Sequence, residues 1–195
     1  MVLGDSLTSG LGLEAGEAYP ELLQQRVDAE GWAVDVVNAG RSGDTTAGGL
    51  RRLDWTLEGN VRVLIVALGG NDGLRGLPVG QMKQNLEAIL ERATDRGIRV
   101  LLAGMEAPPN FGAVYTAEFR EVFRDLATEY DVAFVPFLLE GVAGEVALNQ
   151  PDGIHPNAVG TERVAAHLWS VVAPMLADED LVEVSVSSKP TSGVP

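Results

Sequence analysis

The stretch Val61-Arg62-Val63-Leu64-Ile65-Val66-Ala67-Leu68-Gly69-Gly70-Asn71-Asp72 decides the fold. It opens with a run that is almost entirely apolar and rich in β-branched side chains, and two glycines end that run. This pattern is typical of a short strand buried on both faces of a parallel sheet. Three other runs have the same character, at residues 32–37, 100–103 and 132–135.

Segments of helical period alternate with these strands. They lie at residues 19–27, 82–93, 119–130 and 164–175. Gly31 and Gly97 follow the first two segments, where a left-handed residue commonly ends a helix. Alternating strands and helices with short connections predict an α/β fold, a three-layer α/β/α sandwich. In such folds ligands bind at the carboxyl ends of the strands.

The length of 195 residues and the hydrophobic content of 46% predict one domain with a sizeable core. We place this domain at residues 1–180. In the C-terminal extension, residues 181–195, valines at first alternate with polar residues, so the segment is either an edge strand or a disordered tail.

The start of the chain is short for a strand. Only Met1, Val2 and Leu3 precede the Gly4-Asp5 turn, whereas a strand usually has about five or six residues. We therefore expect a trimmed N-terminus, left by a removed signal peptide or by an artificial boundary. A periplasmic or secreted location is favoured over a cytoplasmic one.

The charge and composition exclude several classes of function. A formal net charge of −14 opposes binding to nucleic acid and to anionic membranes. The absence of cysteine excludes disulfides, thiolate zinc sites and cysteine nucleophiles. No stretch approaches the roughly 20 apolar residues of a membrane span, so no stable membrane insertion is expected. We expect a small-molecule substrate and a monomer or homodimer.

Two glycine-containing turns carry candidate catalytic groups. Ser6 lies in Gly4-Asp5-Ser6-Leu7, after the first apolar residues, and a serine in such a turn is by itself more often a helix cap than a nucleophile. Gly43 lies in Asn38-Ala39-Gly40-Arg41-Ser42-Gly43-Asp44-Thr45. Its bare backbone would let a substrate oxygen reach the N–H, although the segment could also be a turn capped by Asp44 or Thr45.

Two further segments complete a possible site. The Asn71 amide follows the strongest strand and either caps a turn or donates to an oxyanion. In Asp152-Gly153-Ile154-His155-Pro156-Asn157, the acid can reach the Nδ1 atom of His155 while Nε2 takes a serine proton. The other histidine, His167, falls inside the last helix and is expected to be structural.

These four blocks, in this order, resemble the signature blocks of the SGNH/GDSL hydrolases. The resemblance covers residues 1 to about 178 and is closest to the bacterial arylesterase and thioesterase/lysophospholipase branch. It implies a flavodoxin-like sheet of five parallel strands, a catalytic triad of Ser6, Asp152 and His155, and an oxyanion hole of Ser6, Gly43 and Asn71. It also implies that no metal and no cofactor is required. The short first strand and the tail depart from the family pattern.

We therefore expect a serine esterase, a carboxylic ester hydrolase acting on short- to medium-chain acyl or aryl esters, thioesters or lysophospholipids. Substrate contacts are expected from the loops at 73–79 and 105–115, and a packing role for the second loop is equally compatible with the sequence. The candidate contacts are Asp5, Leu7, Met105, Pro108, Phe111 and Ile154.

Three other functions are compatible with parts of the sequence to different degrees. A carbohydrate acetylesterase or acyltransferase would use the same triad in a polar, open pocket. A binding protein without catalysis would not need a nucleophile, a base, an orienting acid and an oxyanion donor together. A dinucleotide site at Gly10-Leu11-Gly12 fails on context, because no strand with a terminal acid follows it at the right distance.

Overall fold

The fold is a single parallel sheet between two layers of helices. The computed structural model describes residues 1–177. Its strands are β1 (Val2–Gly4), β2 (Asn38–Gly40), β3 (Val63–Ala67), β4 (Arg99–Ala103) and β5 (Ala133–Val135). They pair in the order β2-β1-β3-β4-β5, and every pairing is parallel. This confirms the predicted five-stranded, flavodoxin-like sheet.

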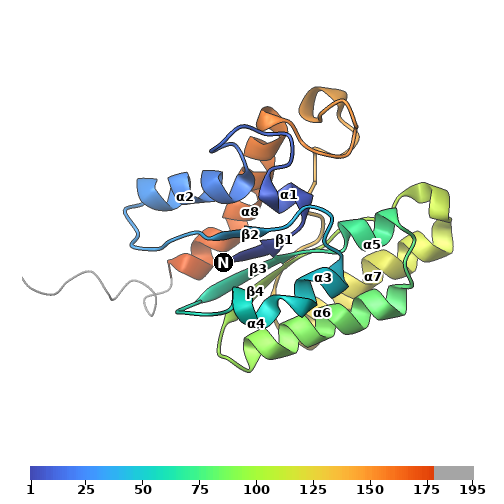
Figure 1. Ribbon diagram of the computed structural model, residues 1–195, viewed down its shortest axis with the longest axis horizontal. Coiled ribbons are helices and arrows are strands. Elements are labelled where there is room, and N and C mark those ends of the chain that lie inside the picture. Colours follow the sequence, from blue (N-terminus) through green and yellow to red (C-terminus); the bar gives the residue numbers. More distant parts are fainter. Residues whose placement is uncertain (178–195) are drawn as a thin grey trace, which may run out of the picture.

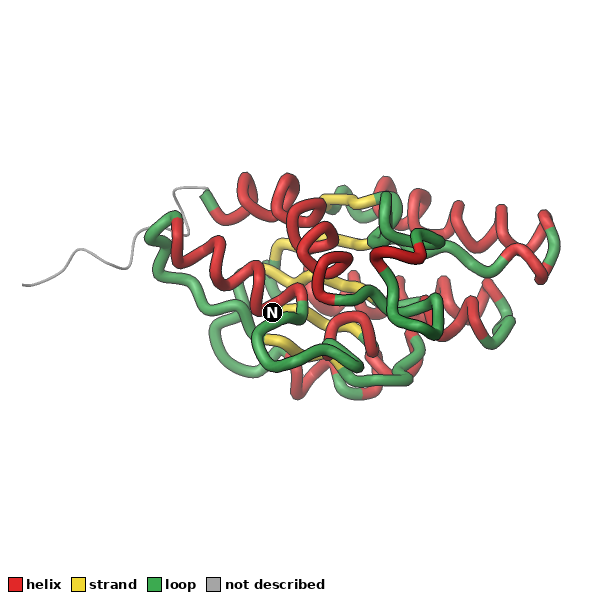
Figure 2. The backbone as a smooth tube through the Cα atoms, turned by 90° about the horizontal axis from the view of Figure 1, so that it is seen from above, coloured by secondary structure: helices red, strands yellow, loops and turns green. Residues whose placement is uncertain are grey.

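Helices cover both faces of the sheet. The longer ones are α2 (Tyr19–Ala29), α6 (Val79–Thr94), α7 (Ala113–Glu129) and α8 (Ala158–Leu176). Helices α2 and α8 pack on each other on one face, and α6 lies between α7 and the short helix α3 (Thr46–Arg51) on the other (Figure 1). Seen from above, the strands run side by side beneath the helices of the nearer layer (Figure 2). The predicted three-layer sandwich is confirmed.

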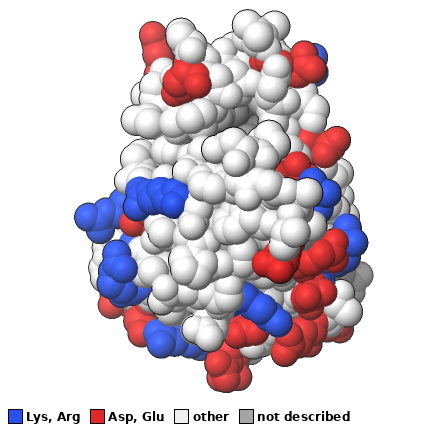
Figure 3. All heavy atoms as spheres, turned by 90° about the vertical axis from the view of Figure 1, so that its right-hand side faces the viewer, with Lys and Arg blue, Asp and Glu red and all other residues white. Residues whose placement is uncertain are grey.

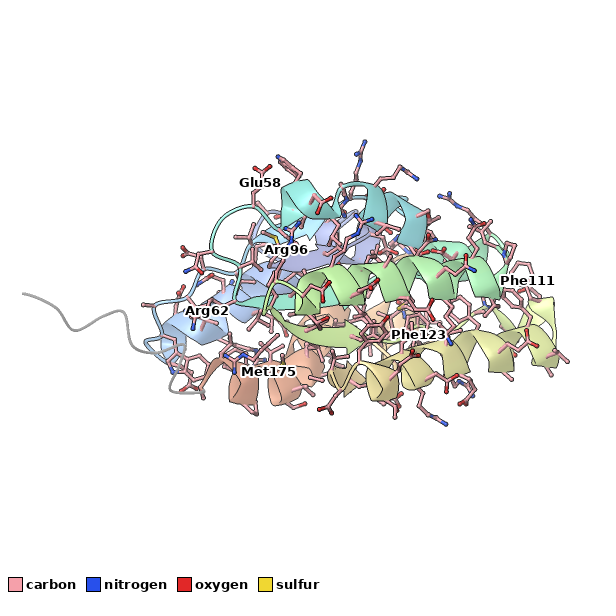
Figure 4. The ribbon with its side chains drawn as sticks, turned by 90° about the horizontal axis from the view of Figure 1, so that it is seen from below. Glu58, Arg62, Arg96, Phe111, Phe123 and Met175 are labelled. Atoms are coloured by element: carbon pink, nitrogen blue, oxygen red, sulfur yellow. The ribbon has the colours of Figure 1, made fainter. Side chains whose placement is uncertain are left out.

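The core forms where the apolar stripes of the helices meet the sheet. All of β3 is buried, as are the inward residues Met82, Leu86, Ile89, Leu90 and Ala93 of α6. Phe123 of α7 points into this interior and tilts against Phe119 at a centroid distance of 5.6 Å (Figure 4). The strand run that opened the sequence analysis is therefore the centre of the core.

One predicted strand is displaced. Residues 32–37 are not a strand, and β2 lies just beyond them. Trp32, Val34 and Val36 still turn inward and alternate with exposed residues, which explains the strand-like pattern. The ladder between β1 and β2 begins only at Val2 and Asn38, so residues 32–36 lack a neighbouring strand. Instead, the Gln24 side chain of α2 bonds the Val34 carbonyl and the Val36 N–H.

The predicted helix ends agree with the structure. Gly31 and Gly97 have φ values of 73° and 72°, in the left-handed region that favours glycine. Short helices that the periodicity did not reveal are α1 (Ser6–Ser9), α4 (Leu53–Thr56) and α5 (Gly70–Leu74). The 3-10 turns η1 (Pro109–Phe111) and η2 (Val146–Leu148) complete the elements of residues 1–177. The proposed edge strand in 181–195 lies outside the described residues.

The register of the sheet determines which loops meet. Gly4 at the end of β1 pairs with Gly40 on one side and Ala67 on the other. The segments that follow these three residues carry Ser6, Gly43 and Asn71, so all three begin at the same edge of the sheet. In Figure 1 this is the edge toward which β1 runs into α1.

Candidate active site

Ser6 is held in a tight turn between β1 and α1. Asp5 caps α1, because its Oδ1 accepts the Leu7 N–H at 3.0 Å, and Ser6 is the first residue of that helix. A side chain on Gly4 would collide with Thr8, whose hydroxyl lies 2.6 Å from that of the buried Tyr19. The glycine therefore allows the close approach that presents Ser6 at the edge of the sheet.

A chain of two hydrogen bonds connects Ser6 to Asp152. The Ser6 Oγ atom lies 2.9 Å from His155 Nε2, and His155 Nδ1 lies 2.7 Å from Asp152 Oδ2. Ser6 and His155 are 149 residues apart in sequence. The arrangement can pass the serine proton to the imidazole while the carboxylate stabilises the imidazolium.

The Asp152 carboxylate is also tied to the backbone of its own loop. Its Oδ1 accepts the N–H groups of Ile154 at 2.9 Å and of His155 at 3.0 Å. The bond from the His155 backbone, then the His155 ring and the Ile154 backbone, lower the pKa of Asp152 to about 2. The carboxylate, whose side chain is 45% exposed, therefore stays charged well below its ordinary pKa of 3.8.

Gln150 connects the loop of His155 to the loop after α1. Its backbone N–H donates to the His155 carbonyl at 2.7 Å, and its side-chain amide donates to the Leu11 carbonyl at 2.8 Å. The loop that carries the base is thereby joined to the segment that follows the helix of the nucleophile. The sequence analysis did not identify Gln150, because a glutamine in a loop has no distinctive pattern.

Asn71 and Gly43 lie on the segments that follow β3 and β2, and both line the same cavity as Ser6. The Asn71 Nδ2 atom donates to Asp5 Oδ2 at 3.0 Å and to the Asp44 carbonyl at 2.9 Å. Gly43 has a φ of 83°, which a residue with a side chain rarely adopts, and its carbonyl accepts from Arg75 at 2.9 Å. Both residues lie beside Ser6 in the lining of one cavity.

Asp72 joins the Gly43 segment to the Asn71 segment. Its buried carboxylate accepts the Thr46 N–H at 2.8 Å and the Thr46 hydroxyl at 2.7 Å. Thr45 is the N-cap of α3, so the segment of Gly43 is also a capped turn, as its sequence allowed. In the sequence, Asp72 can be recognised as a possible site residue because it directly follows Asn71, at the carboxyl end of the buried strand.

Arg52 joins the same segment to β1. Its Nε atom donates to Asp44 Oδ2 at 2.7 Å, and a terminal nitrogen donates to the Gly4 carbonyl at 3.0 Å. The guanidinium thus connects the strand before Ser6 to the residue after Gly43. No sequence pattern singled out this arginine.

A cavity of about 700 Å³ opens over Ser6, and most of its wall is apolar. Figure 3 views this edge of the molecule and shows a hollow bordered by uncharged side chains. Its lining residues are Asp5, Ser6, Leu7, Leu11, Ser42, Gly43, Gly70, Asn71, Leu74, Met105, Glu106, Ala107, Pro108, Pro109, Phe137, Leu139, Ala143, Gly153, Ile154 and His155.

Five of the six candidate substrate contacts line this cavity, and one does not. Phe111 packs on Gly76 and lies 5.4 Å from the Tyr115 ring, at the end of the molecule where α7 begins (Figure 4). The Phe111 ring packs against Gly76 and Tyr115 instead of the cavity, so it supports the 73–79 loop. His167 lies in α8, outside the cavity lining.

Within residues 1–177, no group of three or more histidine, aspartate or glutamate side chains could hold a metal ion. In the same range, no helix is long and apolar enough to cross a membrane.

Comparison with known proteins shows the family. The model of the GDSL-like lipase/acylhydrolase family matches residues 2–163. The chain belongs to this family. It is a carboxylic ester hydrolase, as the resemblance of its sequence blocks implied.

Named relatives support the same assignment. The esterase TesA of Pseudomonas aeruginosa is 42% identical over 177 residues, which are 90% of this chain and 88% of that protein. The thioesterase 1/protease 1/lysophospholipase L1 of Escherichia coli K12 is 37% identical over 90% of this chain and 84% of that protein. A crystal structure of TesA superposes with a TM-score of 0.86 and 43% identity, covering 90% of this chain and 98% of that one.

Proposed function

We propose that this chain hydrolyses short- to medium-chain acyl esters through an acyl-enzyme on Ser6. The observation that carries the proposal is the hydrogen-bonded chain from Asp152 through His155 to Ser6, which opens into a largely apolar cavity. Aryl esters, thioesters and lysophospholipids share the acyl group that such a cavity would hold, and the relatives' names include thioesterase and lysophospholipase.

The proposed reaction has two acyl-transfer steps. Ser6 Oγ forms a bond to the carbonyl carbon while its proton moves to His155 Nε2. The Ser6 and Gly43 N–H groups and the Asn71 amide stabilise the oxyanion. His155 then gives its proton to the leaving oxygen or sulfur, and that bond breaks. In the second step His155 takes a proton from water while the water oxygen attacks the acyl carbon. His155 then returns this proton to Ser6 Oγ as the bond between Ser6 and the acyl carbon breaks, which releases the acid.

Replacing the nucleophile tests the mechanism. Ser6→Ala should lower kcat for p-nitrophenyl butyrate by at least about a thousandfold, because the remaining groups can only bind and polarise the ester. The unfolding midpoint should stay close to that of the parent, since Ser6 Oγ forms no bond in the core. Esterase turnover near the parent rate in a folded Ser6→Ala variant would refute the role of Ser6.

The length of the acyl chain tests the substrate class. Each methylene that enters the cavity should contribute about 0.8 kcal/mol, so kcat/KM should rise about fourfold per CH₂ until the cavity is filled. The measurement is a series of p-nitrophenyl esters from acetate to laurate. A preference for acetate, with activity on acetylated sugars, would instead favour the carbohydrate acetylesterase alternative.

A further inference from the structure

Large apolar side chains that remain exposed to solvent gather at one edge of the sheet. Nine large apolar side chains of residues 1–177 are exposed. Seven of the nine lie between the carboxyl end of a strand and the first turn of the next long helix. Single exposed apolar residues need no explanation, whereas a group of them marks an interaction site. The edge that carries Ser6 therefore differs from the rest of the described surface.

Three of the seven surround the opening of the cavity over Ser6. Leu11, Leu74 and Ile154 line this cavity, and each is between 44% and 48% exposed. A side chain that lines a cavity and is still half exposed lies at its mouth. The three residues come from the segments after β1, β3 and β5, and Figure 3 shows uncharged side chains around the hollow.

Two valines extend this apolar surface beyond the cavity. Val146 begins η2 and is 90% exposed, and Val159 in the first turn of α8 is 54% exposed. The Asn157 side chain donates to the Ala147 carbonyl at 2.9 Å and so joins the start of α8 to η2. Neither valine lines the cavity, so holding an acyl chain does not explain their exposure. The apolar rim is the set Leu11, Leu74, Val146, Ile154 and Val159.

We infer that the apolar rim seats the enzyme on the surface of a lipid aggregate without net charge, so that an acyl chain enters the cavity directly from the aggregate. The inference rests on the proposed hydrolysis at Ser6 and names the form in which the substrate arrives. Burying the rim at the boundary between headgroups and acyl chains removes apolar surface from water, which favours adsorption. The mouth of the cavity then faces the aggregate.

The charges around the rim favour zwitterionic lipids over anionic ones. The segments 5–18 and 136–157 contain several acidic residues and neither lysine nor arginine. Glu145 directly precedes Val146, and Asp152 lies two residues before Ile154. Arg75, which follows Leu74, donates to the Gly43 carbonyl. Anionic headgroups attract clustered lysine and arginine and repel carboxylates. Adsorption at this edge therefore depends on apolar contact.

Binding to vesicles tests the inference without any catalytic step. Vesicles of ether-linked phosphatidylcholine contain no ester, so the result does not depend on the role of Ser6. We expect the parent protein to co-sediment with these vesicles, and to bind ether-linked phosphatidylglycerol vesicles at least about fivefold more weakly at 0.1 M salt. Failure to bind the zwitterionic vesicles, or a preference for the anionic ones, would overturn the inference.

A matched pair of double variants locates the contact. Val146→Ser/Val159→Ser removes two rim side chains, and Val37→Ser/Trp55→Ser removes two exposed apolar side chains elsewhere. Val37 precedes β2, and Trp55 follows Asp54, which pairs with two arginines at the end of α6, so both lie toward the amino ends of the strands.

The rim variant should bind phosphatidylcholine vesicles at least about tenfold more weakly than the parent, because two side chains that leave water on binding have become polar. The control variant should stay within about twofold of the parent. Equal losses in the two variants would overturn the inference. A dimer of the parent that the rim substitutions dissociate, without vesicle binding, would instead show that a second copy covers the rim.

Kinetics separate this inference from the proposed function. In the rim variant, kcat/KM for dissolved p-nitrophenyl butyrate should stay within about twofold of the parent, because neither valine lines the cavity. Turnover of p-nitrophenyl laurate in micelles of an uncharged detergent should fall at least about fivefold. Equal turnover by parent and rim variant in micelles would overturn the inference. A parent that binds vesicles but hydrolyses neither ester would contradict the proposed function and leave the rim assignment standing.

Discussion

Asp152 orients the base although it is far from buried. Its side chain is 45% exposed, yet its two oxygens accept three hydrogen bonds from a loop of four residues, 152–155. A local turn can therefore supply the acid of this chain without a buried pocket. The arrangement requires little beyond the spacing of the acid and the histidine, which is why this part of the site was visible in the sequence.

Asp152→Asn should lower kcat by about 10⁴-fold with little change in KM. The amide can still accept the backbone N–H groups through one atom, but its NH₂ group then faces His155 Nδ1. That favours the tautomer with the proton on Nε2, which cannot take the serine proton. The measurement is kcat and KM on p-nitrophenyl butyrate; a variant with more than a tenth of the parent kcat would contradict the proposed orienting role.

The low pKa of Asp152 also predicts a pH response. A carboxylate whose pKa is lowered to about 2 supports His155 fully above its ordinary pKa of 3.8, and this support is lost only as the pH falls toward 2. We therefore expect no loss of kcat from protonation of Asp152 between about pH 4 and pH 7. If the parent shows an acid-side decline in this range that Asp152→Asn abolishes, this expectation is wrong.

Among the elements, α3 depends on a partner outside itself. Its first residue, Thr46, donates twice to the buried carboxylate of Asp72, which lies on α5. Its N-cap, Thr45, makes only a longer bond of 3.3 Å to Gly48. The start of α3 is therefore held by Asp72 as well as by its own N-cap. Gly43 lies shortly before this helix, so the same contact helps to position it.

Asp72→Ala should lower the free energy of unfolding by about 2 to 4 kcal/mol, because two buried donors lose their acceptor. It should also lower kcat, because the Gly43 segment is released from the Asn71 segment. Thr45→Ala is the matched control and should cost about 1 kcal/mol, the usual value for a lost cap. Urea unfolding measures both; equal losses in the two variants would show that the Asp72 contact contributes little.

At the scale of the whole molecule, the dominant property is charge. The formal net charge of −14 at pH 7 produces mutual repulsion that opposes the compact state. Salt screens this repulsion, because the Debye length falls from about 30 Å at 0.01 M to about 3 Å at 1 M. The acidic surface is therefore suited to solutions of high ionic strength.

The midpoint of thermal unfolding at pH 7 should rise by a few degrees between 0.01 M and 0.5 M salt. Sodium chloride and potassium chloride should act alike if screening is the cause. Hydrolysis of p-nitrophenyl butyrate should also persist at molar salt. A midpoint that falls with salt, or precipitation at molar salt, would show that self-repulsion does not limit this fold.

The sequence by itself determined the features that depend on local pattern. The buried run at 61–68, the amphipathic helices and the glycines that end them are visible because burial repeats with the period of the element. Asp152 and His155 are visible because a rare residue type stands at a fixed short distance from an acid. The family, and with it the flavodoxin-like sheet of five parallel strands, was implied by the four blocks together.

Only the tertiary structure decided the contacts between distant segments. The bonds from Asn71 to Asp5, from Thr46 to Asp72 and from Arg52 to Gly4 span 66, 26 and 48 residues. They depend on the register in which neighbouring strands end at the same edge, and periodicity carries no information about register between strands. The same reason explains why 32–37 is not a strand although its alternation is correct: a strand also needs a neighbour to pair with.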